Sequence, residues 1–132
     1  MIFVDASALC AILLGEPDAD MLAARLLGET GLLTSAVAVY ETVAVVARSV
    51  KGDVKAARQD VTDMLRVNDI RLVPIGEAER ELALDAFDRY GKGRHPARLN
   101  MSDCFAYACA RTHGAALLFK GDDFSLTDVA VA

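Results

Sequence analysis

The chain opens with a short apolar run that ends abruptly in a carboxylate. Residues 2–4 are isoleucine, phenylalanine and valine, and Asp5 follows them directly. An uninterrupted run of β-branched and aromatic side chains predicts a short strand buried on both faces of a sheet. Such strands form parallel α/β sheets, whose ligands bind at the carboxyl ends of the strands. Asp5 therefore stands where such a protein binds its ligand, although a lone aspartate here could simply cap the next helix.

The rest of the chain alternates strand and helix patterns. Apolar runs at 32–34, 70–75 and 115–119 predict three more strands, and a fifth could form at 129–131. Helical spacing of apolar residues covers 8–14, 18–27, 36–50, 54–68, 77–90 and 103–113. This alternation predicts an α/β fold with a central, mainly parallel sheet of four to five strands. The length of 132 residues predicts a single domain over residues 1–132.

The composition indicates a globular protein, with 54% hydrophobic and 25% charged residues. No apolar run approaches the ~20 residues that a membrane span needs. The opening apolar run stops at Asp5 and has no basic segment before it, so we expect no signal peptide and a cytoplasmic location. Cys10, Cys104 and Cys109 lie in helical segments rich in alanine and leucine, which predicts small buried thiols.

One acidic residue stands inside an otherwise apolar helix. The segment 36–50 is apolar almost throughout, so we expect it to be buried nearly all round. Glu41 lies in its midst without a lysine or arginine within one helical turn. A buried carboxylate is costly unless something pairs with it. A salt bridge to a distant arginine remains open, but a metal ion or a cluster of acids accounts better for Glu41.

A basic loop leads into a third acid. Residues 91–100 contain Lys92, Arg94 and Arg98, and they run straight into the helix that carries Asp103. We expect Ser102 to cap this helix, which places Asp103 in its first turn, where the helix dipole favours a negative charge. The loop is either a solvated run of charge or a contact for phosphates.

The acids are predicted to meet at one edge of the sheet. With right-handed crossovers, the carboxyl ends of the strands share one edge. Four carboxylates placed there without matching bases would repel one another strongly. A hard divalent cation, Mg²⁺ or Mn²⁺, resolves this conflict because it prefers carboxylate oxygens. The net charge of −5 comes largely from these acids and does not exclude a nucleic acid partner. They are Asp5, Glu41, Asp103 and Asp122.

Four segments together resemble one known family. They are residues 2–8, a hydrophobic strand followed by Asp, a small residue, Ser and Ala; 40–42, a glutamate on a buried helix; 100–108, an acid before an alanine-rich helix; and 117–124, a strand that ends in Asp-Phe. In this order and at these separations they resemble PIN-domain ribonucleases, specifically the VapC toxins of VapBC toxin–antitoxin pairs. The resemblance implies a three-layer α/β/α sandwich and a Mg²⁺-dependent endoribonuclease, with Mn²⁺ as a second possible metal.

The resemblance also implies which residues form the site. Metal binding and catalysis fall to Asp5, Glu41, Asp103 and Asp122. For the fourth acid we prefer Asp122, which comes first after the strand, and expect Asp123 to support the turn before Phe124. Ser7 is expected to orient Asp5 or its water. The basic loop is expected to hold RNA phosphates without reading the sequence, through Lys92, Arg94 and Arg98.

The partners implied are an RNA substrate, a VapB-type antitoxin and a second copy of the chain, with no membrane. The helices near the amino terminus are unusually apolar, and excess apolar surface indicates an interface. We expect an antitoxin helix to lie in a groove between them. The leucines and isoleucine concerned are Leu9, Ile12, Leu13, Leu14, Leu22, Leu26 and Leu27.

Two other classes of function remain open. A phosphatase or receiver-like α/β domain also gathers acids at a strand edge, but it needs an acceptor aspartate on an exposed mid-chain strand, and the sequence offers none. A catalytically silent interaction module would need no metal, and a Mg²⁺ titration followed by thermal unfolding would identify it.

Overall fold

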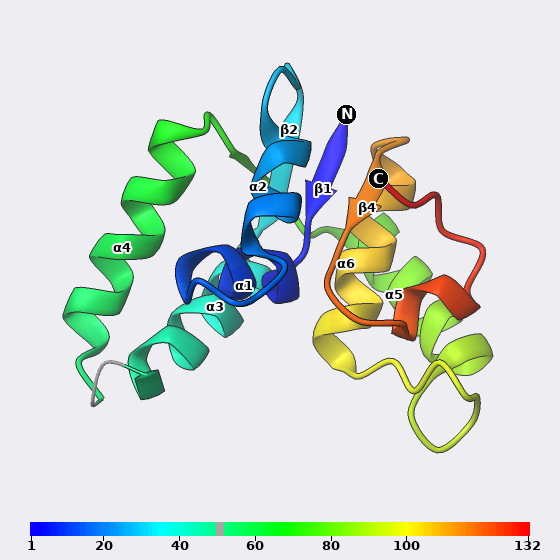
Figure 1. The fold of residues 1–132 in the computed structure, drawn as a ribbon. Coiled ribbons are helices and arrows are strands. Elements are labelled where there is room, and N and C mark those ends of the chain that lie inside the picture. The colour runs from blue at the N-terminus through cyan, green and yellow to red at the C-terminus, as the bar shows by residue number, and fades with distance from the viewer. Residues whose placement is uncertain (50–51) are drawn as a thin grey trace.

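The computed structural model describes residues 1–49 and 52–132. Four short strands alternate with six α-helices, and one 3-10 helix, η1, follows the last strand within the described part of the chain (Figure 1). The order is β1 (Ile2–Val4), α1 (Ala6–Leu13), α2 (Ala19–Leu26), β2 (Leu32–Ser35), α3 (Ala36–Ser49), α4 (Val54–Val67), β3 (Arg71–Val73), α5 (Glu77–Tyr90), α6 (Met101–Thr112), β4 (Ala116–Leu118) and η1 (Asp123–Leu126).

The strands form one parallel sheet in the order β3-β2-β1-β4. The strand that opens the chain therefore lies inside the sheet, with Phe3 opposite Leu33 on one side and Leu117 on the other. The parallel arrangement places the carboxyl ends of all four strands at one edge, as the sequence predicted. An isolated bridge joins Val131 to Leu117, so the expected fifth strand amounts to a single pairing.

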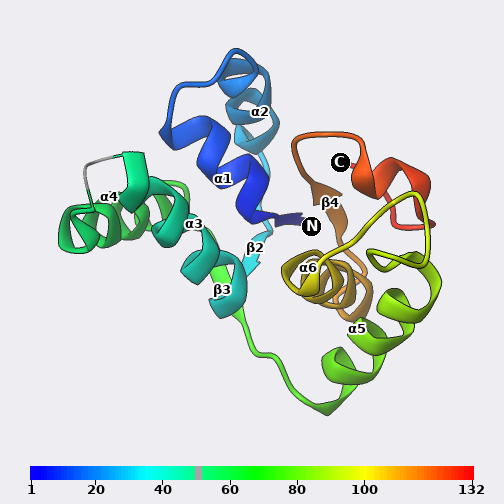
Figure 2. The ribbon, with the colours of Figure 1, turned by 90° about the horizontal axis from the view of Figure 1, so that it is seen from below.

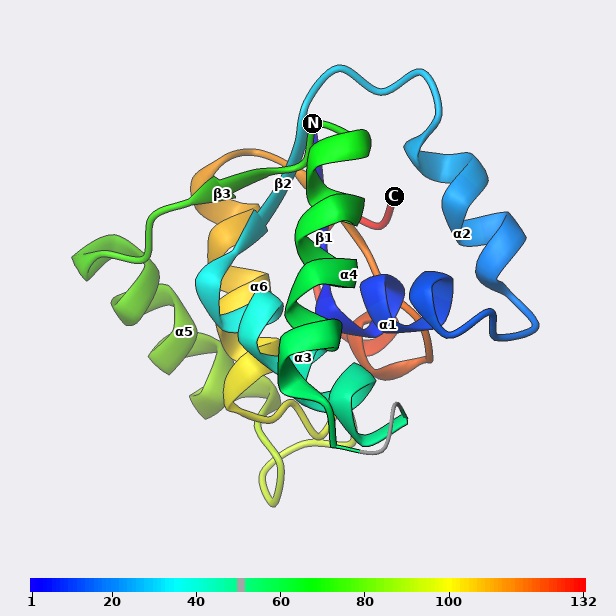
Figure 3. The ribbon, with the colours of Figure 1, turned by 90° about the vertical axis from the view of Figure 1, so that its left-hand side faces the viewer.

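Alternate side chains of β1, β2 and β4 face two separate cores. Phe3 and Leu117 point into a core built with α5 and α6, whereas Ile2 and Leu118 point into a core built with α1, α2 and α4. Figure 1 shows the sheet between these two helical layers, and Figure 2 shows α3 between α4 and α1 on the second face. Figure 3 views the fold from the side of α4. The predicted three-layer α/β/α sandwich is confirmed. β1 and β4 read as continuously apolar because both of their faces are covered, whereas Arg71 and Leu72 of the edge strand β3 are exposed.

Two local expectations differ from the structure. The helix of residues 36–50 was expected to be buried nearly all round, but Tyr40 is 79% exposed and only one face of α3 is buried. Ser102 does not cap α6, since Asn100 occupies that position and accepts a hydrogen bond from the Asp103 amide at 2.9 Å. Val50, which the sequence predicts to be the last residue of the helix that contains Glu41, lies outside the described residues.

The cysteine prediction is confirmed. Cys10, Cys104 and Cys109 are free and buried. Burial raises the pKa of all three thiols, to about 11 for Cys10 and Cys104 and about 12 for Cys109. The thiolate is the reactive form of cysteine, so these thiols are inert at neutral pH. No helix of the described residues combines the length and the apolar character that crossing a membrane requires.

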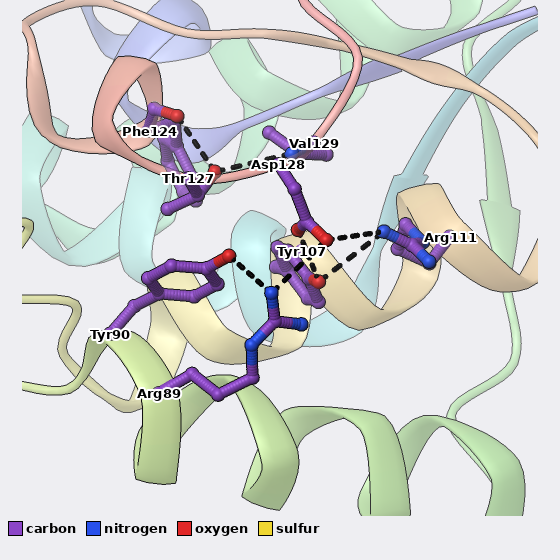
Figure 4. Close-up of polar contacts among 8 residues, drawn as sticks. All are labelled: Arg89, Tyr90, Tyr107, Arg111, Phe124, Thr127, Asp128 and Val129. Carbon is purple, nitrogen blue, oxygen red and sulfur yellow. Dashed lines mark hydrogen bonds and ion pairs between the residues drawn. The ribbon is translucent and has the colours of Figure 1, made fainter.

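A polar cluster fixes the segment after η1 to the helices beneath it (Figure 4). Asp128 accepts a hydrogen bond from the Tyr107 hydroxyl at 2.7 Å and from the Arg89 guanidinium at 3.2 Å. Arg111 forms an ion pair with the same carboxylate at 3.3 Å. The donors come from α5 and α6, and they hold Asp128 between them. We call this cluster the Asp128 clamp. It holds in place the segment of chain that begins with Asp123.

Candidate active site

Asp5 lies at the carboxyl end of β1 and is only 2% exposed. Its Oδ2 accepts two hydrogen bonds from Ser7, from the amide at 3.0 Å and from the hydroxyl at 2.5 Å. The hydrogen bond from the Ser7 amide makes Asp5 the N-cap of α1, which is the alternative role that the sequence left open for this residue. The other oxygen, Oδ1, is buried and has no hydrogen-bond partner in the part of the chain that the structure describes. A cap needs one carboxylate oxygen, so the cap leaves Oδ1 unexplained.

Ser7 links two ends of the chain at this point. Its hydroxyl accepts a hydrogen bond from the Lys120 amide at 3.0 Å and donates its own proton to Asp5. The Asp5 amide in turn donates to the Leu118 carbonyl at 3.0 Å. These bonds fix the start of α1 against the end of β4, and they hold the Asp5 carboxylate in one orientation.

Glu41 is held from a different helix. It projects from α3, half-buried, and its Oε2 accepts a hydrogen bond from the Ser102 hydroxyl in the first turn of α6. Figure 2 looks at the fold from the side where β1 ends, and there α3, α6 and the start of α1 surround that end. The sequence places no base near Glu41, and in the structure the Ser102 hydroxyl donates a hydrogen bond to its carboxylate.

Asp103 stands in the first turn of α6, as predicted, but its cap partner is Asn100. Asp103 Oδ2 accepts from the Asn100 amide at 3.0 Å, so the two residues cap the helix reciprocally. The pKa of Asp103 is raised to about 7, chiefly by burial and in addition by the negative charges of Asp5, Glu41 and Asp123. The hydrogen bond from the Asn100 amide acts in the opposite direction and lowers it. Burial likewise raises the pKa of Asp5, and Glu41 adds to the effect. Four carboxyl groups from four segments therefore act on one another.

The acids share one cavity of about 500 Å³. Its lining includes Asp5, Glu41 and Asp103, together with Asp123. Asp122, which was expected to be the fourth acid, is exposed and is absent from this lining. Its carbonyl accepts a hydrogen bond from the Ser125 amide at 3.1 Å, so Asp122 closes the turn that begins η1. The two aspartates thus have the opposite placement from the one expected.

The three cations of the basic loop are divided. Lys92 and Arg98 line a neighbouring cavity together with Asp103 and Asp123. Arg98 has a φ of 54°, an uncommon backbone conformation for a residue other than glycine. Arg94 instead forms an ion pair with Asp88 at 2.9 Å, and it is absent from both cavities. Lys92 and Arg98 are therefore placed to meet a ligand of the acids, and Arg94 is not.

The donor set fits a hard divalent cation. Carboxylate oxygens are the ligands that Mg²⁺ and Mn²⁺ prefer, and the unpartnered Oδ1 of Asp5 is one such oxygen. Burial and the neighbouring carboxylates raise the pKa values of Asp5 and Asp103, so a cation bound between them would stabilise their charged forms. Among the residues that the structure describes, no three acidic, histidine or cysteine side chains form a ready-made metal cluster. Carboxylates without a cation between them repel one another.

Sequence reasoning missed four residues at this site. Glu16, Asn100 and Lys120 line the acidic cavity, and Ser102 contacts Glu41. Lys120 carried a signal, because it directly follows a predicted strand at the same edge as Asp5. Glu16 carried none, since it lies in a turn whose position in space depends on how α1 and α2 pack.

Comparison with known proteins places this geometry in a family. The PIN domain model matches residues 2–130. A Ribonuclease VapC of Mycolicibacterium smegmatis is 42% identical over 127 residues, which cover 96% of each chain.

Two solved structures share the fold at 18% sequence identity. The Mycobacterium tuberculosis toxin VapC20, described as cleaving the sarcin-ricin loop, has a TM-score of 0.78 and covers 100% of this chain and 98% of its own. A toxin-antitoxin complex from Klebsiella pneumoniae has a TM-score of 0.71, with coverage of 100% and 97%. The match of the PIN domain model to residues 2–130 and the 42% identity to a Ribonuclease VapC agree with the acidic cavity at the strand ends. They show that the chain belongs to the PIN-domain family and, within it, to the VapC ribonucleases.

Proposed function

We propose that this protein is the endoribonuclease toxin of a toxin–antitoxin module and hydrolyses RNA phosphodiester bonds in the cytoplasm with a divalent cation. One observation carries the proposal. The Oδ1 atom of Asp5 is buried and has no hydrogen-bond partner among the described residues, and Asp5 lines a cavity with four other carboxyl side chains, those of Glu16, Glu41, Asp103 and Asp123. Burying such an atom is costly unless it has a ligand to bind. The relatives named VapC ribonuclease provide the class of reaction.

Asp5 and Asp103 would hold the cation, with Glu41 and Asp123 binding it directly or through water. Asp123 takes the role first expected of Asp122 because it lines the cavity. Mg²⁺ is the expected ion, and Mn²⁺ fits the same oxygens. When bound, such an ion lowers the pKa of water and offsets negative charge on the leaving oxygen.

The remaining residues would position these groups and the substrate. Ser7 directs its proton to Asp5 Oδ2, which leaves Oδ1 to face the ion. Ser102 holds the Glu41 carboxylate at the cavity. Lys92 and Arg98 would bind RNA phosphates beside the acids, which orients the strand without selecting its sequence.

The decisive experiment compares single carboxylate variants in RNA cleavage. We expect no cleavage without a divalent ion, and loss of cleavage in Asp5→Asn and Asp103→Asn with the fold retained. Asp123→Asn should lower cleavage strongly, and the neighbouring Asp122→Asn serves as its matched control and should cleave normally. Full activity in Asp103→Asn would refute the assignment of the site. A larger loss in Asp122→Asn than in Asp123→Asn would restore Asp122 as the fourth acid.

Two apolar grooves would bind the protein partners. Several of the amino-terminal leucines are buried in the core, namely Leu9, Leu22 and Leu26. Exposed apolar side chains gather instead between α3 and α4, where Leu72 and Val54 line a groove, and between α5 and α6, where Leu84 and Phe87 line another. We assign the α3–α4 groove to a helix of a VapB-type antitoxin, because Leu13 of α1, one of the residues expected to form the antitoxin groove, packs against α3 and α4. We assign the α5–α6 groove to a second copy of the chain.

A pair of variants tests this division. Leu72→Asp should abolish co-purification with the antitoxin and leave the oligomeric state unchanged. Leu84→Asp should give a monomer that still binds the antitoxin. The opposite pattern, or no effect of either, would contradict the assignment.

A further inference from the structure

Lys120 is the one lysine or arginine among the described residues that line the acidic cavity. It follows β4, and its backbone amide is fixed by the hydrogen bond to the Ser7 hydroxyl at 3.0 Å. Lys92 and Arg98 line the neighbouring cavity. Asp103 and Asp123 line both cavities, so these acids lie between Lys120 and the two loop cations. Positive charge is therefore available on two sides of the carboxylates.

Two carboxylates at the turn between α1 and α2 hold the Lys120 ammonium. Glu16 forms an ion pair with Nζ, and Asp18 lies 3.5 Å from it. The three side chains are between 29% and 38% exposed, so the group lies at the mouth of the cavity rather than in the core. Ion pairs that are this exposed are worth little and exchange readily with other partners.

The charges around this mouth decide what a nucleic acid would meet there. Without Lys120, the side of the cavity nearest α1 and α2 would present only Glu16, Asp18 and the acids of the site. An RNA strand carries a phosphate on each nucleotide, so it would be repelled on that side as soon as it crossed the cavity. Lys120 is the cation placed to prevent this.

We propose that Lys120 binds an RNA phosphate on the opposite side of the carboxylates from Lys92 and Arg98, and that Glu16 masks this subsite until RNA displaces it. This inference rests on the proposed ribonuclease function and adds the path of the substrate. The strand runs from the loop of residues 91–100, across the four acids, to the turn between α1 and α2. Lys120 is a positioning residue, since it contacts a phosphate and not the reacting water.

The test measures binding of a fluorescent single-stranded RNA by anisotropy over a range of salt concentrations. All proteins carry Asp103→Asn to prevent cleavage, and cleavage rates are measured separately without that change. Lys120→Ala should weaken binding about two- to five-fold, as expected for an exposed charge contact. It should also reduce the slope of log K against log salt by about 0.7, the value for one phosphate contact on a single strand. Lys55→Ala removes a charge from α4, far from the site, and should leave the slope unchanged.

The Glu16→Gln variant separates the subsite from a merely structural ion pair. If Glu16 masks Lys120, Glu16→Gln strengthens RNA binding, whereas Asp20→Asn, a nearby acid that does not touch Lys120, has a smaller effect. The gain should vanish in the double variant with Lys120→Ala, because the two residues act on the same phosphate. A purely structural pair would instead make both single variants weaken binding alike and lower the melting temperature together.

The outcomes also distinguish the subsite from the proposed function. An unchanged salt slope in Lys120→Ala, or a gain from Glu16→Gln that persists without Lys120, would overturn the subsite while wild-type cleavage stands. A wild-type protein that neither binds nor cleaves RNA would overturn the ribonuclease assignment and the subsite with it.

Discussion

The Asp128 clamp supports a quantitative prediction for Tyr107→Phe. The change removes only the hydroxyl that donates to Asp128 at 2.7 Å and leaves the buried ring in place. A hydrogen bond to a charged acceptor contributes about 1.5–3 kcal/mol. The Asp128 side chain is 44% exposed, so water replaces part of what is lost. We expect the free energy of unfolding at neutral pH to fall by about 1–2 kcal/mol, which lowers the melting temperature by about 4–7 °C.

The same bond predicts how the loss depends on pH. The Tyr107 hydroxyl and the arginines hold the pKa of Asp128 at about 2, below its usual value of 3.8. A carboxyl group with a lowered folded pKa stabilises the fold above its unfolded pKa, and this contribution is lost as the pH falls from 3.8 through about 2. After the discount for exposure, it is worth about 1 kcal/mol. The gap in stability between wild type and Tyr107→Phe should therefore narrow below about pH 4.

Urea unfolding at a series of pH values measures both quantities. Tyr90→Phe is the matched control, because it removes a hydroxyl from the same cluster that accepts from Arg89 at 2.6 Å and touches no carboxylate. Its effect should be smaller and should not change between about pH 4 and pH 2. A gap for Tyr107→Phe that stays constant from neutral pH to pH 2, or one no larger than that of Tyr90→Phe, would refute this account of the clamp.

Three further predictions concern the site and its surroundings. Removing Lys92 and Arg98 together should lower the salt slope of RNA binding by about 1.4. Arg94→Ala, which breaks the contacts of Arg94 with Asp88 and Phe87, should leave the slope unchanged in the same anisotropy assay. Mg²⁺ at about a hundred times its dissociation constant should stabilise the wild type by about 2.7 kcal/mol in thermal unfolding, and chelation should reverse this; a response of equal size in Asp5→Asn would place the ion elsewhere. Gly91→Ala should cost about 1–3 kcal/mol in urea unfolding because its Cβ would lie 2.3 Å from the Phe87 carbonyl oxygen; a neutral result would show that α5 can shift.

The fold was predictable because its signals are local. The run Ile2–Val4 reads as a strand covered on both faces, and the helical periodicity of 77–90 gives the bounds of α5 without error. The burial of α3 was misjudged for the opposite reason. Its valines and alanines are apolar all round, but only tertiary packing decides which face a neighbour covers, and α3 leaves the face of Tyr40 exposed.

The sequence indicates a candidate set of acids but not its geometry. Asp5 and Asp103 are candidates because each adjoins a strand end or a helix start that the sequence makes visible. The choice between Asp122 and Asp123 depends on the conformation of the turn that starts η1, because this conformation decides which of the two adjacent side chains lines the cavity. The contact of Ser102 with Glu41 joins residues 61 positions apart, and no local pattern reports such a pairing.

The place of β1 in the sheet has a consequence for the making of the protein. The first strand pairs with β4, whose Ala116 lies opposite Ile2, so β1 stays without one of its two neighbours until residues 116–118 have left the ribosome. Asp5 and Glu41 emerge early, whereas Asp103 and Asp123 emerge near the end of the 132 residues. At ~5–20 residues per second, synthesis lasts on the order of ten seconds or more. During most of that time the nascent chain would carry only Asp5 and Glu41 of the four proposed site carboxylates, so the proposed ribonuclease site could not yet form.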